Sequence, residues 1–156
     1  MSVDNSSISD YFHAMDHETD FIISLMSRIR EKANRLITAE LSARGLHGLK
    51  PIHGDLLLAL FTSDRPTMKE LADRVDRKKS TVTTLVDKLV QLGFATKTMD
   101  KLDSRVFRVS LTPEGKALKP QLIDISRTLL ARVYKDMPGE ERRQVVRLLK
   151  QINDNW

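Results

Sequence analysis

The chain has 156 residues, 40% of them apolar and 30% charged, with no cysteine and a net charge of +5. This composition is typical of one globular domain, or of a small domain with long helical extensions, and it excludes disulfides and thiolate metal ligands. No apolar run approaches the roughly 18 residues that span a bilayer, and the polar N-terminus lacks a signal-peptide pattern, so we predict a cytoplasmic protein without membrane contact.

A long amphipathic helix is predicted after a polar tail, residues 1–8. Apolar residues recur at steps of three and four from Phe21 to Leu41, and Gly45 is placed to end the helix. At roughly 30 residues this helix is long for a small domain, so we expect its apolar stripe to need a further surface to cover it.

A second helix is expected from Pro51 to Phe61, because proline suits the first turn of a helix. Its residues 56–61 are apolar on nearly every side, which indicates a central position in the core. The polar segment 63–66 is the predicted turn after it.

Two short helices with a tight polar connection follow. Thr67 and Glu70 have the spacing of a capping box, which predicts the start of a third helix. After the charged turn 76–79, apolar residues at helical spacing predict a fourth helix, which Gly93 ends. Two such helices must share one core, which is the arrangement of a helix-turn-helix.

The apolar period then changes from helical to alternating. Residues 94–99 and 106–111 are predicted to pair as a hairpin with its tip at 100–104. Thr112 is the expected N-cap of a further helix that continues to Val133. A break at 136–139 precedes a last amphipathic helix.

This order of elements resembles the MarR family of bacterial transcription regulators. The resemblance covers nearly the whole chain and is most specific from Leu71 to Gly115. It rests on Leu71-Ala72, Thr83, Leu85-Val86-Asp87-Lys88-Leu89, Leu92-Gly93 and Leu111-Thr112-Pro113-Glu114-Gly115.

The resemblance implies a mainly α fold with a small β wing. In this interpretation a winged helix-turn-helix domain, residues 46–112, lies between an N-terminal dimerisation helix, 9–45, and C-terminal dimerisation helices, 113–156. The first and last helices of family members interlock in a homodimer, which would cover the long N-terminal stripe.

The wing departs from the family pattern at one position. The pattern Asp-x-Arg-Asp-x-Arg stands here as Asp100-Lys101-Leu102-Asp103-Ser104-Arg105, so Leu102 replaces the first arginine. This change affects one wing-to-domain or wing-to-phosphate contact, for which Lys101 could substitute in part.

The charge of the chain points to a nucleic-acid partner. Residues 65–109 contain 11 lysines and arginines against 6 acidic residues, and the rest of the chain is balanced. Such a concentration is the electrostatic footprint of a nucleic-acid-binding surface. The N-terminal residues of a recognition helix meet base edges in the major groove. The predicted base contacts are Lys78, Lys79, Ser80, Thr81, Thr83 and Thr84.

Four of these six side chains are short hydroxyls, which predicts a permissive direct readout. The alternative for Ser80 and Thr81 is that they only cap the helix. The resemblance places Arg105 at the position of the family's wing arginine, which implies that it enters the minor groove with Lys101 beside it. A narrow groove attracts a guanidinium because it concentrates negative potential. A solvated hairpin arginine is the alternative.

The predicted phosphate contacts are Thr67, Arg77, Lys88, Lys97 and Arg108. Asp103 is expected to hold a nearby arginine.

Two smaller hypotheses concern ligands. His13 and His17 have a spacing that binds divalent metals, but polar residues at a solvated helix start explain it as well, so we predict no metal and no cofactor. The resemblance implies a small anionic aromatic effector bound between the dimer helices and the winged domain, lined by Tyr11, Arg28 and His53. A salt-bridged arginine and a capping histidine are the alternatives.

No catalytic motif is present, so we do not expect an enzyme. The sequence predicts a transcription regulator that binds double-stranded DNA sequence-specifically. The expected form is a ligand-responsive homodimeric repressor on a pseudo-palindromic operator. The alternative is a winged-helix module that binds an acidic protein, or a nonspecific architectural DNA-binding module.

Overall fold

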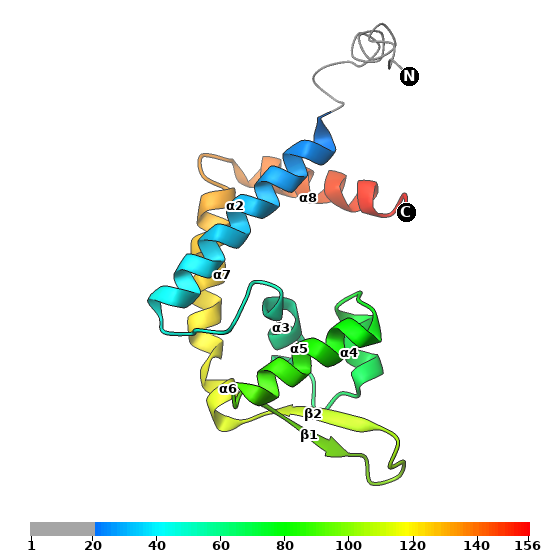
Figure 1. Cartoon of the computed structure of the whole chain (residues 1–156). Coiled ribbons are helices and arrows are strands. Elements are labelled where there is room, and N and C mark those ends of the chain that lie inside the picture. The colour runs from blue at the N-terminus through cyan, green and yellow to red at the C-terminus, as the bar shows by residue number, and fades with distance from the viewer. Residues whose placement is uncertain (1–20) are drawn as a thin grey trace, which may run out of the picture. The chain divides into compact units, whose positions relative to one another are not determined.

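A computed structural model of the protein describes residues 21–156. The polar tail and the predictions for Tyr11, His13 and His17 lie outside the described residues. The elements in chain order are α2 (Ile22–Ala43), α3 (His53–Phe61), α4 (Met68–Arg74), α5 (Lys79–Gln91), β1 (Ala95–Met99), β2 (Phe107–Leu111), α6 (Pro113–Ala117), α7 (Lys119–Val133) and α8 (Gly139–Asn153) (Figure 1). A mainly helical chain with one two-stranded antiparallel sheet confirms the predicted fold class.

The chain forms two compact units that divide between Leu36 and Ile37, inside α2. The last two turns of α2 belong to the second unit because Leu41 is buried in its core and Ile37 packs against that core. No helix of residues 21–156 combines the length and the apolar character that crossing a membrane requires.

The core of the second unit is built from the helix-turn-helix and one strand. Its largest fully buried side chains are Leu56, Leu57, Leu71, Val82, Val86, Leu89 and Val109. They come from α3, α4, α5 and β2, which confirms the central position predicted for α3. Leu58 departs from that prediction, because it is 64% exposed.

Two side-chain caps fix where the helices begin. The hydroxyl of Thr67 accepts from the amide of Glu70 at 3.2 Å, and a Glu70 carboxylate oxygen accepts from the amide of Thr67 at 2.6 Å. This is the predicted capping box, and its hydrogen bonds lower the pKa of Glu70. Thr112 caps α6 in the same way, since its hydroxyl accepts from the amide of Gly115 at 3.0 Å.

The wing is anchored to the turn ahead of α4. The strands pair in the register Ala95↔Leu111 to Met99↔Phe107, and the loop between them projects beyond the helices (Figure 1). The amide of Val109 donates to the carbonyl of Pro66 at 2.9 Å, so β2 is held on its other edge as well. β2 therefore pairs with β1 on one edge and is tied to the turn ahead of α4 on the other.

The single helix predicted after Thr112 is wrong, because the structure interrupts it at Leu118. Pro120 has no amide proton to donate to the carbonyl of Lys116, and its ring excludes that carbonyl from a regular helical position. The chain therefore ends α6 and begins α7. The later break is confirmed, with Asp136 in the left-handed region at φ 59°.

Candidate nucleic-acid interface

The N-terminus of α5 presents the predicted base-contacting residues. Lys78 is the N-cap in an extended conformation, and no side chain caps the helix. This rules out the alternative that Ser80 or Thr81 serves only as a cap. Lys78, Lys79 and Ser80 are exposed, while Thr81 is half-buried.

The two following threonines use their hydroxyl protons within the helix. Thr83 donates to the carbonyl of Lys79 at 2.9 Å, and Thr84 donates to the carbonyl of Ser80 at 3.2 Å. Each oxygen keeps lone pairs that can accept from a base, and each methyl group can pack against thymine. The structure therefore orients these two residues as acceptors and apolar contacts, not as donors.

The opposite face of α5 fixes which residues point outward. Val82, Val86 and Leu89 are fully buried, and Leu85 is nearly so. A turn of the helix about its axis would expose these side chains at a cost of about 1.5–3 kcal/mol each. The polar face is thus held in one orientation by the core.

Arg105 lies exposed in the loop at the end of the wing. Its amide donates to a carboxylate oxygen of Asp103 at 2.9 Å, and Asp100 accepts from the amide of Leu102 at 2.9 Å. These backbone contacts order the loop. Within residues 21–156 no hydrogen bond or ion pair occupies the Arg105 guanidinium, so it is free to bind an external anion.

One expectation for the loop needs correction. Asp103 does not hold an arginine side chain, because its carboxylate accepts from the backbone amide of Arg105. Leu102 is 98% exposed, which agrees with the expected loss of a wing-to-domain contact at this position.

Arg108 anchors the wing through hydrogen bonds within the chain, and its phosphate contact remains a prediction. Its Nε donates to Asp100, and its Nη1 donates to the carbonyl of Arg65 at 3.1 Å. Arg65 in turn donates to the hydroxyl of Thr98 at 3.1 Å. The hydrogen bond and charge of Arg108 lower the pKa of Asp100 to about 2, and the same pair raises the pKa of Arg108. The loop and the turn before α4 are joined by this network.

The remaining phosphate candidates divide into three kinds. Thr67 forms the capping box, in which its hydroxyl accepts a hydrogen bond and keeps its own proton to donate, so its phosphate contact remains a prediction. Lys97 pairs with Asp87 of α5, and Lys88 donates to Gln91 at 3.0 Å. These solvent-facing contacts are weak enough to exchange for a phosphate.

Arg77 is exposed, and no described contact occupies it. The prediction that Lys101, also exposed, assists in the groove remains a prediction. Sequence reasoning missed Arg65 and Asp87, whose roles depend on partners brought together by the fold.

The effector residues are placed less favourably. His53 is buried, and its Nδ1 accepts from the amide of Lys50 at 2.9 Å, as expected for a capping histidine. Burial lowers the pKa of His53, so the ring is neutral at pH 7. Arg28 is exposed on the part of α2 that belongs to the first unit. No cluster of metal-ligating side chains occurs in the part of the chain that the structure describes.

Residues 47–106 match the MarR family in sequence. The HTH-type transcriptional regulator SarZ of Staphylococcus aureus is 34% identical to this chain over 71 residues. The aligned residues make up 46% of this chain and 48% of SarZ, so the alignment spans about half the length of that relative. The central segment of the chain is therefore similar to the MarR family.

Solved structures share the fold of this chain over most of its length. The PcaV transcriptional regulator of Streptomyces coelicolor, in complex with its natural ligand, has a TM-score of 0.80 at 20% identity and covers 90% of this chain and 96% of its own. A mutant MarR from E. coli complexed with operator DNA has a TM-score of 0.76 at 23% identity. The match covers 86% of this chain and 95% of the mutant MarR chain. These likenesses confirm the winged helix-turn-helix fold.

Proposed function

We propose that the protein is a transcription regulator that binds double-stranded DNA sequence-specifically. In this proposal α5 enters the major groove with the residues from Lys78 to Thr84, and Arg105 enters the adjacent minor groove. The observation that carries the proposal is the outward polar end of α5, held by a buried apolar face, beside a wing whose terminal guanidinium is unpaired. SarZ is named a transcriptional regulator, and the MarR mutant of the same fold was crystallised with operator DNA.

The regulator is proposed to act as a homodimer. α8 is amphipathic over 15 residues, yet none of its residues is buried in the single chain. Val145, Val146, Leu148 and Leu149 remain exposed, as do Ile22, Leu25 and Ile29 of α2. Exposed apolar faces of this extent mark protein contacts. Two copies would place two α5 helices about 34 Å apart, in successive major grooves of a pseudo-palindromic site.

Repression that responds to a ligand completes the proposal. A small anionic aromatic molecule would shift the population between dimers with different spacing of the two α5 helices, and thereby release the operator. The support is the PcaV structure, which shares this fold and holds its natural ligand.

The test combines selection of DNA fragments by the purified protein with binding measurements on the selected site. Affinity is expected to fall roughly a thousandfold between 50 and 200 mM salt if six or more phosphates are neutralised. Binding that is salt-sensitive but indifferent to sequence would contradict specific regulation and favour an architectural role.

Variants separate the roles of the contacts. Arg105→Ala should weaken binding by roughly tenfold or more, whereas Arg132→Ala, an exposed arginine of α7, should leave it nearly unchanged. Thr84→Ala should alter the base preference, while Arg77→Ala should reduce the salt slope by about 1 with the preference unchanged. Unchanged operator affinity in Arg105→Ala would refute the assignment of the wing.

A further inference from the structure

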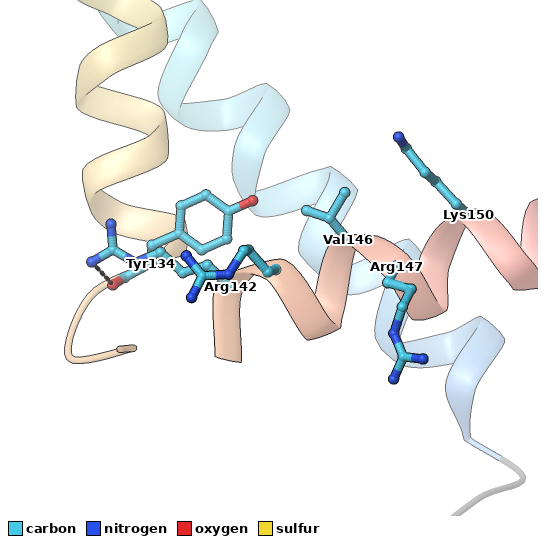
Figure 2. A pocket seen from close by; sticks show the side chains of 6 residues that line it. Tyr134, Arg142, Val146, Arg147 and Lys150 are labelled. Atoms are coloured by element: carbon cyan, nitrogen blue, oxygen red, sulfur yellow. Dashed lines mark hydrogen bonds between the residues drawn. The ribbon is translucent and has the colours of Figure 1, made fainter. Parts of the chain in front are cut away.

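An open cavity lies where the end of α7 meets α8 (Figure 2). Its volume is about 450 Å³, which is within the range of small-molecule sites. The lining side chains are Tyr134, Arg142, Arg143, Val146, Arg147 and Lys150. We call this cavity the α7–α8 groove. Four of its six side chains are cationic, and none belongs to α5 or the wing.

One of the cations is held in place by the backbone. Arg142 donates from Nε to the carbonyl of Met137 at 2.8 Å and from Nη2 to the carbonyl of Tyr134 at 3.4 Å. Its guanidinium also lies 5.3 Å from the centre of the Tyr134 ring. Carbonyls and an aromatic face orient the guanidinium but do not cancel its charge. The groove thus contains a preorganised positive charge at the end where α7 stops.

The other cations form a column along α8. Arg143 and Arg147 are four residues apart, and Arg147 and Lys150 are three apart, so they are neighbours on one helix face. Arg143 is paired with Glu140. Among residues 21–156 no acidic side chain pairs with Arg142, Arg147 or Lys150. Like charges at these spacings repel one another, and the chain supplies no described anion that relieves this repulsion.

The groove also offers carbon surface. Figure 2 shows the Tyr134 ring and the Val146 side chain on the side of the groove nearest α7, with Arg147 and Lys150 further along α8. Guanidinium groups match the planar oxygens of phosphate and carboxylate, and lysine binds them as a point charge. These cations lie within one or two turns of α8. They therefore match a ligand with two or more anionic groups better than they match a monovalent anion.

We propose that the α7–α8 groove binds a small anion that carries two or more phosphate or carboxylate groups. The bound anion neutralises Arg147 and Lys150, which no acidic side chain pairs with among residues 21–156, and Arg142 contacts it at the Tyr134 end. Binding stabilises the fold because the repulsion within α8 is relieved. This site shares no residue with α5 or the wing.

The experiment uses the full chain and two probes, sodium tripolyphosphate for phosphate and citrate for carboxylate. Each is titrated by isothermal titration calorimetry, and thermal unfolding is followed with and without it. At least one probe should bind with one site per chain and raise the melting temperature. A preference for one probe identifies which oxyanion the groove takes.

Two double variants with the same loss of charge locate the site. Arg147→Gln with Lys150→Gln should weaken binding of the probe at least tenfold. Arg105→Gln with Lys79→Gln, on the DNA face, should leave its dissociation constant within twofold. The proposal is overturned if neither probe binds, if both double variants weaken binding equally, or if only the DNA-face variant does.

Discussion

Gly115 offers the sharpest test of the packing, because helix propensity and tertiary structure predict opposite effects for Gly115→Ala. In an ordinary helix, alanine in place of glycine stabilises by about 1 kcal/mol. Here a Cβ on Gly115 would lie 2.0 Å from the carbonyl oxygen and 2.9 Å from the carbonyl carbon of Phe94. Both are backbone atoms at the start of the wing, so no side-chain rotation relieves the overlap.

The magnitude follows from what must move. Displacing backbone in a packed region costs about 1–3 kcal/mol. The upper end applies here because the Cβ would lie more than about 1 Å closer to the Phe94 oxygen than the roughly 3.5 Å of a normal contact. The amide of Thr112 donates to the same Phe94 carbonyl at 3.1 Å, and loss of that hydrogen bond adds about 1 kcal/mol. After the helix-propensity gain is subtracted, Gly115→Ala should lower the free energy of unfolding by about 3 kcal/mol.

Urea unfolding followed by far-ultraviolet circular dichroism, at one fixed protein concentration, measures this difference. The melting temperature should fall by roughly 6–12 °C, since 1 kcal/mol corresponds to about 2–4 °C for a chain of this size. Gly54→Ala in α3 is the matched control, because a Cβ there meets nothing within 4 Å. The control should be unchanged or stabilised by up to about 1 kcal/mol. Equal stability of Gly115→Ala and the wild type would refute the close approach of α6 to the wing.

Three further outcomes test the network and the caps. The pKa of His53 is lowered from 6.5 by burial, so the unfolded chain takes up its proton first and stability should fall as the pH drops below about 6.5. His53→Gln should flatten this dependence between pH 7 and pH 5, and an unchanged slope would contradict it. Asp100→Asn should weaken DNA binding in fluorescence anisotropy, although it removes a negative charge, because the pair with Arg108 that anchors the wing is lost. Asp64→Asn removes the same charge without that contact and should bind equally or slightly better; equal behaviour of the two variants would argue against a positioning role. Thr67→Ala should lower the free energy of unfolding, measured by urea unfolding, by about 1 kcal/mol, while Thr67→Ser should retain most of the stability that the cap provides. If both variants were as stable as the wild type, the cap would be unimportant.

The predicted interface was recovered best where it depends on neighbouring residues. The spacing of Thr67 and Glu70 was sufficient to predict the capping box, and Gly93, at φ 77°, ends α5 as expected. The alternation of apolar residues placed the hairpin. These features are set by hydrogen bonds and side-chain periodicity over three or four residues, so sequence spacing alone contains them.

The roles of individual charges were predicted less well. Arg108 was expected at a phosphate, and its contacts within the chain, with Asp100 and with the backbone of Arg65 43 residues earlier, were not predicted. Lys97 pairs with Asp87, 10 residues away on α5. Composition shows that residues 65–109 are basic. Which of these charges pair with one another depends on the register of the hairpin and on the packing of the hairpin against α5.

The sequence by itself determined most of the helices, the wing and the outward end of α5, because caps and periodicity act between residues close in the chain. Tertiary structure alone decided which cations are free, since that depends on residues that meet only after folding. It left Arg105 unpaired, directed Arg108 to Asp100, and brought the backbone of Phe94 against Gly115. A local pattern has no information about such contacts, because their free energy exists only when the whole core is assembled.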